Sequence, residues 1–154
     1  MSAVTSSVSF MMSHVGICVR DLDVATRFYT ALGFEPSYRR AASGADFERL
    51  LGLDALDLEL VLLRLGDHKI ELIRHRSPAP LPRPDTTMNT LGLTHLAFYV
   101  PDVDAAVALV EAHGGTVEHD RRITVEVHGE QRRYVFCRDP DGNRVELIQG
   151  SVLG

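Results

Sequence analysis

The sequence predicts an α+β fold built from two copies of one βαβββ module, and three observations lead to this prediction. First, the segment that starts at His14 returns 81 residues later at His95, with matching aspartates, small residues and a closing glycine. Second, each copy shows strand alternation, then helical spacing, then further strand-like segments. Third, each copy ends on an apolar strand that contains one glutamate, Glu71 or Glu146.

The first module is expected over residues 13–75. Alternation in its first strand places apolar residues on the face that the helix covers and His14 on the opposite face. Asp21 or Asp23 can cap the following helix, and Gly33 ends it. The expected elements are a strand at 13–19, a helix at 24–32, a strand at 34–40, a loop or short helix at 43–52, and strands at 57–65 and 68–74 that a tight turn at Gly66-Asp67 connects.

A proline-rich linker is expected at residues 76–91, because its prolines fit neither a helix interior nor a central strand. The second module follows over residues 92–150, and alternation again places His95 on the face opposite the helix. Residues 1–12 are expected to form a flexible N-terminal tail. The expected elements of the second module are a strand at 93–100, a helix at 103–113, and strands at 116–119, 131–137 and 143–149.

Composition excludes several functional classes. A chain of 154 residues has enough bulk for the core of one ordinary domain. Its net charge of -5 gives no basic footprint for nucleic acid, and no apolar run approaches the ~18 residues that a membrane span needs. The first residues do not resemble a signal peptide, and Cys18 and Cys137 are the only cysteines. We therefore expect a cytoplasmic protein with free thiols and no nucleic-acid or membrane partner.

Four residues form the candidate functional site: His14, Glu71, His95 and Glu146. A glutamate between large apolar residues in a central strand needs a cation or hydrogen-bond donors, since an unpaired buried carboxylate is costly. One such glutamate alone more often meets an arginine, and one strand histidine is more often an ordinary polar residue. The duplication of both favours a shared metal site. Imidazole and carboxylate ligands suit Ni, Zn, Co, Mn or Fe(II), and four ligands on an octahedral ion leave two adjacent positions for substrate.

These motifs resemble the vicinal oxygen chelate superfamily, also called the glyoxalase/bleomycin-resistance/dioxygenase superfamily, over nearly the whole chain. The matching segments are the helix entry after His14, its counterpart after His95, and the run from Asp139 to Ile148. The resemblance implies two βαβββ modules that form a curled, mixed eight-stranded sheet around one divalent metal ion. It also implies that His14, Glu71, His95 and Glu146 are the metal ligands.

Within the superfamily, the ligand set is similar to that of bacterial glyoxalase I. Methylmalonyl-CoA epimerase is also similar, but it usually carries Gln where this chain has Glu71. Glyoxalase I of that type grips glutathione with an arginine and an asparagine at the positions of Cys18 and His75. The resemblance to glyoxalase I therefore does not extend to the residues that bind glutathione.

The resemblance implies a metal-dependent lyase or isomerase that moves a proton on a small oxygenated substrate through a metal-bound enediolate. Glu146 is the expected base, with Glu71 as its counterpart on the opposite face of the substrate. A homodimer is the expected assembly. Two alternatives stay open: an Fe(II)-dependent dioxygenase that uses His14, His95 and Glu146, and a non-catalytic ligand-binding or drug-binding protein.

Overall fold

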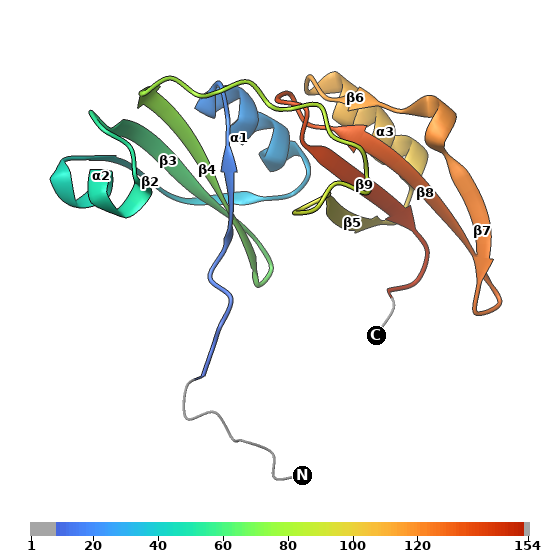
Figure 1. Ribbon diagram of the computed structural model, residues 1–154. Helices are drawn as coiled ribbons and strands as arrows, with labels where there is room; N and C mark the ends of the chain where they lie inside the picture. The colour runs from blue at the N-terminus through green and yellow to red at the C-terminus, as the bar shows by residue number, and fades with distance from the viewer. Residues whose placement is uncertain (1–8, 153–154) are drawn as a thin grey trace, which may run out of the picture.

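The computed structural model describes residues 9–152 and shows two β-sheets side by side, with helices α1 and α3 packed on them (Figure 1). Residues 1–8, most of the predicted tail, lie outside the described residues. The first half contains β1 (Val15–Cys18), α1 (Leu22–Ala31), β2 (Glu35–Ser43), α2 (Ala45–Leu51), β3 (Asp57–Leu65) and β4 (His68–Ser77). The second half contains β5 (Leu96–Val100), α3 (Val103–Ala112), β6 (Thr116–Val117), a 3₁₀ turn (His119–Arg121), β7 (Ile123–Val127), β8 (Glu130–Arg138) and β9 (Arg144–Gln149).

The two halves repeat one topology, which confirms the predicted α+β class and internal repeat. The first sheet has the order β1-β4-β3-β2, and the second has the order β5-β9-β8-β6 with β7 also paired to β8. In each half the first strand runs parallel to the last one, so Gly16 lies opposite Glu71 and Ala97 opposite Glu146. The residue just before each first strand is thereby placed beside the glutamate. No helix among residues 9–152 is long and apolar enough to cross a membrane.

Strand β7 is the main element that the sequence did not predict. Ile123, Val125 and Val127 alternate with polar residues along it, and it forms an antiparallel hairpin with β8. The hairpin turns at His128 and Gly129, whose φ angles of 53° and 80° are both positive, as a two-residue turn of this kind requires. The second sheet therefore has five strands and the first has four.

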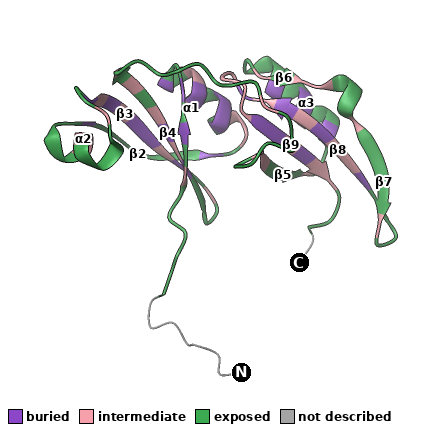
Figure 2. Ribbon diagram, in the orientation of Figure 1, coloured by how far each residue is buried: buried purple, intermediate pink, exposed green. Residues whose placement is uncertain are grey.

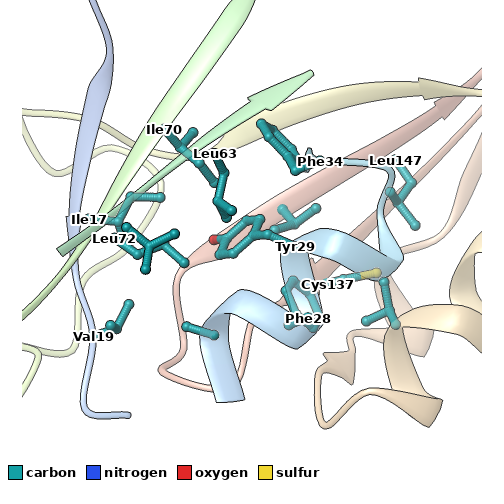
Figure 3. Packing of buried hydrophobic residues seen from close by; sticks show 14 of the residues in the cluster. Ile17, Val19, Phe28, Tyr29, Phe34, Leu63, Ile70, Leu72, Cys137 and Leu147 are labelled. Carbon is teal, nitrogen blue, oxygen red and sulfur yellow. The ribbon is translucent and has the colours of Figure 1, made fainter. Parts of the chain in front are cut away.

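One hydrophobic core runs through both halves (Figures 2 and 3). Phe28 and Tyr29 of α1 are fully buried, and Phe34 stacks edge-on against Phe98 of the second half at 5.9 Å between ring centroids. The Tyr29 hydroxyl donates a 2.8 Å hydrogen bond to the buried carboxylate of Asp139. The two copies of the module are therefore packed into one body by their helix-bearing faces.

Candidate metal centre

The first half-site consists of His14 and Glu71. His14 lies one residue before β1, not within it as the alternation predicted, and Glu71 lies in β4. Their side chains approach to 3.8 Å between Nε2 and Oε1, and 36% and 16% of these side chains are exposed. The hydroxyl of Ser13 lies 3.0 Å from His14 Nδ1. The hydroxyl engages one ring nitrogen, and the other ring nitrogen is directed to the carboxylate.

The second half-site repeats this arrangement with His95 and Glu146. His95 lies one residue before β5, and Glu146 lies in β9. His95 Nε2 is 3.2 Å from a Glu146 carboxylate oxygen, and Thr94 Oγ1 is 2.8 Å from His95 Nδ1. The ring of Phe136 packs edge-on against His95 with 5.3 Å between centroids. The predicted equivalence of the two halves therefore extends to side-chain geometry.

Sequence reasoning missed the two hydroxyls, Ser13 and Thr94. They occupy equivalent positions, 81 residues apart, immediately before the two histidines. A hydroxyl on one ring nitrogen fixes the orientation of an imidazole and leaves the other nitrogen for a metal, which is the usual environment of a ligating histidine. The same repeat that revealed the histidines contained this signal.

Neither glutamate of the two half-sites is explained by pairing with an arginine or lysine. Among residues 9–152, no arginine or lysine forms an ion pair with Glu71 or Glu146, and the histidine is the partner in each case. Ligands at neighbouring positions of one octahedral ion, with bonds of about 2.1 Å, lie about 3 Å apart. The separation of 3.2 Å at His95 and Glu146 fits such neighbours, and that of 3.8 Å at His14 and Glu71 is wider. A direct polar contact between each histidine and its glutamate, without a metal ion, also accounts for these separations.

The chain does not bring the two pairs together. Within the described residues, no group of three or more histidine, cysteine, aspartate or glutamate side chains lies close enough to hold one ion. The reason is the shared core: Ile17 and Leu72 face it in the first half, and Val145 and Leu147 face it in the second. Each His–Glu pair lies on the opposite face of its own sheet. A single described chain therefore presents two half-sites.

A hollow of about 630 Å³ lies beside Glu146. Tyr134 and Phe136 of β8 line it. Ile123 and Val125 of the unpredicted β7 and Met88 of the linker also line it, with Arg121 at its edge. The wall next to the second half-site is thus mainly apolar and aromatic, which suits the carbon skeleton of a small ligand.

Cys18 lies four residues after His14, and strand alternation places both on the same face of the first sheet. Desolvation and the nearby Asp141 carboxylate raise the pKa of Cys18 above its usual value. The thiol therefore stays protonated near neutral pH, while metal binding and nucleophilic attack both need the thiolate. Cys18 and Cys137 are both free, and Cys18 is best described as a small residue beside the half-site.

Fold, repeat and half-site geometry together define a protein of the paired-βαβββ class with one His–Glu pair in each module. The chain belongs to the glyoxalase/bleomycin resistance protein/dioxygenase superfamily, whose family model matches residues 11–147. The resemblance inferred from the sequence is thereby confirmed.

Several proteins are similar to this chain in sequence or in structure. The chain is 36% identical to protein YaeR of Escherichia coli over 88% of this chain and 93% of that protein. It is 34% identical to a 2-epi-5-epi-valiolone epimerase of an Actinomyces species, over 88% of this chain and 76% of the epimerase. A glyoxalase family protein from Bacillus cereus superposes with a TM-score of 0.80 at 25% identity, over 96% and 98% of the two chains. Glyoxalase I from Zea mays shares the fold, with a TM-score of 0.60 at 24% identity, over 90% of this chain and 44% of that one.

Proposed function

We propose that this protein is a metal-dependent isomerase or lyase that moves a proton on a small oxygenated substrate, and that two protomers share each metal centre. The observation that carries the proposal is the duplicated unit of hydroxyl, histidine and glutamate at His14/Glu71 and His95/Glu146. In a homodimer, the first half-site of one protomer would face the second half-site of its partner. Each centre would then hold two imidazoles and two carboxylates, a set that suits Ni, Zn, Co, Mn or Fe(II).

The class of reaction is supported by the epimerase relative. An epimerase inverts one carbon, and the simplest route removes a proton from that carbon and returns it to the other face. The relative is 34% identical over most of both chains, so similar chemistry is a reasonable transfer. The likeness to glyoxalase I, at 24% identity, supports the fold alone. The two free cysteines fit a cytoplasmic setting.

The protein's own residues would perform the proton transfer. A bound divalent ion would act as a Lewis acid for charge on two substrate oxygens. Glu146 would take the proton from the adjacent C–H group and return it to the same or the neighbouring carbon, with Glu71 as its counterpart on the opposite face. Tyr134 and Phe136 would hold the carbon skeleton and limit access of water. His14 and His95 would hold the ion and take no part in proton transfer.

The first test replaces Glu146 by Gln, which keeps the size of the side chain and removes its charge and basicity. We expect turnover to fall by roughly 10²–10⁴-fold, the range that a positioned general base contributes, while the fold is retained. The matched control is Glu126→Gln, an exposed glutamate in β7. Near-normal turnover in Glu146→Gln would remove this residue from the mechanism.

The assay does not depend on a known product. Purified protein is first analysed for bound metals, and its activity is then measured with 2-epi-5-epi-valiolone, a hemithioacetal and a branched acyl-CoA in D2O. Proton transfer incorporates deuterium at the reacting carbon, which mass spectrometry detects. A reaction that stops without oxygen would instead identify the Fe(II)-dependent dioxygenase.

A second candidate is a non-catalytic ligand-binding protein, and the apolar hollow beside Glu146 favours it. Such a protein would retain an aromatic ligand through Tyr134 and Phe136 without any metal. Metal-free protein that binds an aromatic compound tightly, and whose affinity is unchanged by addition of metal ions, would support this candidate over the enzyme.

A further inference from the structure

We propose that a second pocket, between the proline-rich linker and β9, binds a small oxyanion, either a carboxylate or a phosphate group. The pocket has a volume of about 180 Å³ and is separate from the hollow described above. Two arginines and four threonines supply its polar lining: Arg83, Thr86, Thr87, Thr90, Thr94 and Arg144. None of these residues is an acid, so the lining offers donors and positive charge.

Arg144 is the central observation, because it is a buried cation without an anionic partner. Only 5% of the residue is exposed. Its two terminal nitrogens donate to the carbonyl and the hydroxyl of Thr86, and its Nε has no hydrogen-bond partner. Eight of the other fourteen arginines in residues 9–152 reach carboxylates, namely Arg39, Arg49, Arg76, Arg121, Arg122, Arg132, Arg133 and Arg138.

Burial makes this arrangement costly unless a ligand completes it. A guanidinium withdrawn from water loses several kcal/mol of solvation, and neutral hydrogen bonds recover only part of that loss. The buried carboxylate of Asp139 shows the contrast, because it accepts hydrogen bonds from Tyr29 and Asn143. Arg132 is also buried and has two nitrogens without a hydrogen-bond partner, but the carboxylate of Glu130 lies 4.0 Å from it. An oxyanion in the pocket would give Arg144 the charge that the protein itself does not provide.

The remaining lining fits an anion of this size. Arg83 is exposed and uses one nitrogen for a 2.6 Å hydrogen bond to Asn143, which leaves its other donors available. A planar guanidinium pairs with two oxygens of a carboxylate or phosphate at once, and threonine hydroxyls can donate to the others. The volume of about 180 Å³ is below the usual range for drug-sized ligands, about 300–1,000 Å³. The pocket therefore suits one small charged group.

The pocket adjoins the second half-site. Thr94 lines it and also contacts His95, while Arg144 lies two residues before Glu146 on the same face of β9, about 7 Å along the strand. An anionic group held here would place the rest of a small molecule beside Glu146. We infer that the substrate carries a carboxylate or phosphate group, an extension that rests on the proposed function, whereas the anion pocket itself does not.

The test uses metal-free protein and inorganic phosphate, at constant ionic strength maintained with sodium chloride. Thermal unfolding should shift upward in a saturable way, because a ligand that binds only the folded state stabilises it. We expect Arg144→Met to weaken phosphate binding by roughly ten- to hundredfold, the effect of losing hydrogen bonds to a charged group. Arg83→Met should weaken it less, and Arg121→Met, in the separate hollow, should leave it unchanged.

The stability of Arg144→Met without phosphate provides a further check, and Arg83→Met provides a second variant. In the absence of phosphate, Arg144→Met should be at least as stable as the natural protein, because it removes an uncompensated buried charge. Absence of a saturable shift in the natural protein, or an equal shift in Arg144→Met, would overturn the proposal. Should Arg144→Met not fold, the exposed Arg83→Met variant decides by the same criterion, with loss of affinity expected.

Steady-state kinetics distinguish whether the anion is a group on the substrate or a free ion. If the substrate carries the group, phosphate should inhibit competitively, and Arg144→Met should raise KM for an anionic substrate more than for a neutral analogue. If the pocket holds a free ion, phosphate should bind without competing with substrate. A protein that turns over no substrate but binds phosphate through Arg144 would contradict the proposed function and support the pocket.

Discussion

The histidines of the two half-sites are each oriented by the hydroxyl of the preceding residue. Ser13 Oγ lies 3.0 Å from His14 Nδ1, and Thr94 Oγ1 lies 2.8 Å from His95 Nδ1. The repetition of His14, Glu71, His95 and Glu146 is visible in the sequence, and their role as metal ligands stays a prediction. The sequence did not predict the pocket that we propose as an anion site, because Arg144 and the linker threonines are brought together only by the path of the linker over the sheet.

Removal of these hydroxyls should weaken metal binding. Ser13→Ala and Thr94→Val each delete one hydrogen bond that fixes an imidazole ring, so metal affinity should fall by roughly 10–100-fold. The measurement is a competition titration with a chelator of known affinity. Thr124→Ala, an exposed residue of β7, is the control. Unchanged affinity in both variants would show that the hydroxyls do not support metal ligands.

The hydrogen bond from Tyr29 to Asp139 is a buried polar contact between the two halves. Tyr29→Phe deletes the 2.8 Å hydrogen bond to Asp139 and leaves this buried carboxylate with its remaining donors. We expect the free energy of unfolding to fall by roughly 1–3 kcal/mol, as measured by urea denaturation. Tyr38→Phe, at a tyrosine that is 45% exposed, should change little. An equal effect at both positions would contradict this assignment.

At the scale of elements, the two helices were predicted from their periodicity, and one strand was missed. Helices α1 and α3 have buried apolar residues and begin after the aspartate caps Asp21 and Asp102, of which the first was a predicted cap. Strand β7 was missed because Ile123–Val127 is short and largely exposed, and its strand character comes from pairing with β8. Edge strands of this kind depend on a neighbour, so their own sequence identifies them poorly.

The cap of α1 provides a pH-dependent prediction. The N–H groups of Val24 and Asp23 donate to Asp21 and hold its pKa below the usual 3.8. A carboxyl with a lowered folded-state pKa stabilises the fold above its unfolded pKa, and this contribution disappears as pH falls through the lowered value. Asp21→Ala should therefore lower Tm near neutral pH, and the difference from the natural protein should shrink below about pH 4.

The control for this prediction is Asp21→Asn, since asparagine also caps helices and does not titrate in this range. It should retain most of the stability at neutral pH. A Tm difference between Asp21→Ala and the natural protein that stays constant down to pH 2 would exclude the cap carboxylate as its cause.

At the scale of the whole molecule, the arrangement of the two half-sites predicts subunit complementation. A His14→Ala, Glu71→Gln variant loses the first half-site, and a His95→Ala, Glu146→Gln variant loses the second. Each should be inactive alone. If the centres form between protomers, random mixing makes about half of the dimers mixed and gives each of these one intact centre. The mixture should then recover roughly a quarter of natural activity, whereas a centre within one chain would give no recovery.

The sequence could not decide between these two assemblies, because the βαβββ repeat is the same in both. The decision lies in which faces of the modules pack together. In this structure the helix-bearing faces do, through Phe34, Phe98 and the Tyr29–Asp139 hydrogen bond. That packing directs the two His–Glu pairs away from the core, so the proposed metal centres would need a second copy of the chain.

The shared hydrophobic core makes each repeat depend on the other for its stability. One repeat alone would expose the apolar surface that the other repeat now covers, so it would need to pack against another molecule. In this protein both repeats lie on the same polypeptide, and each covers the apolar surface of the other. Because the two repeats share one core, a disruption at their contact should unfold both in one transition. A side chain at Gly115 is an example, since an added Cβ would lie 2.9 Å from Phe28 of the first repeat.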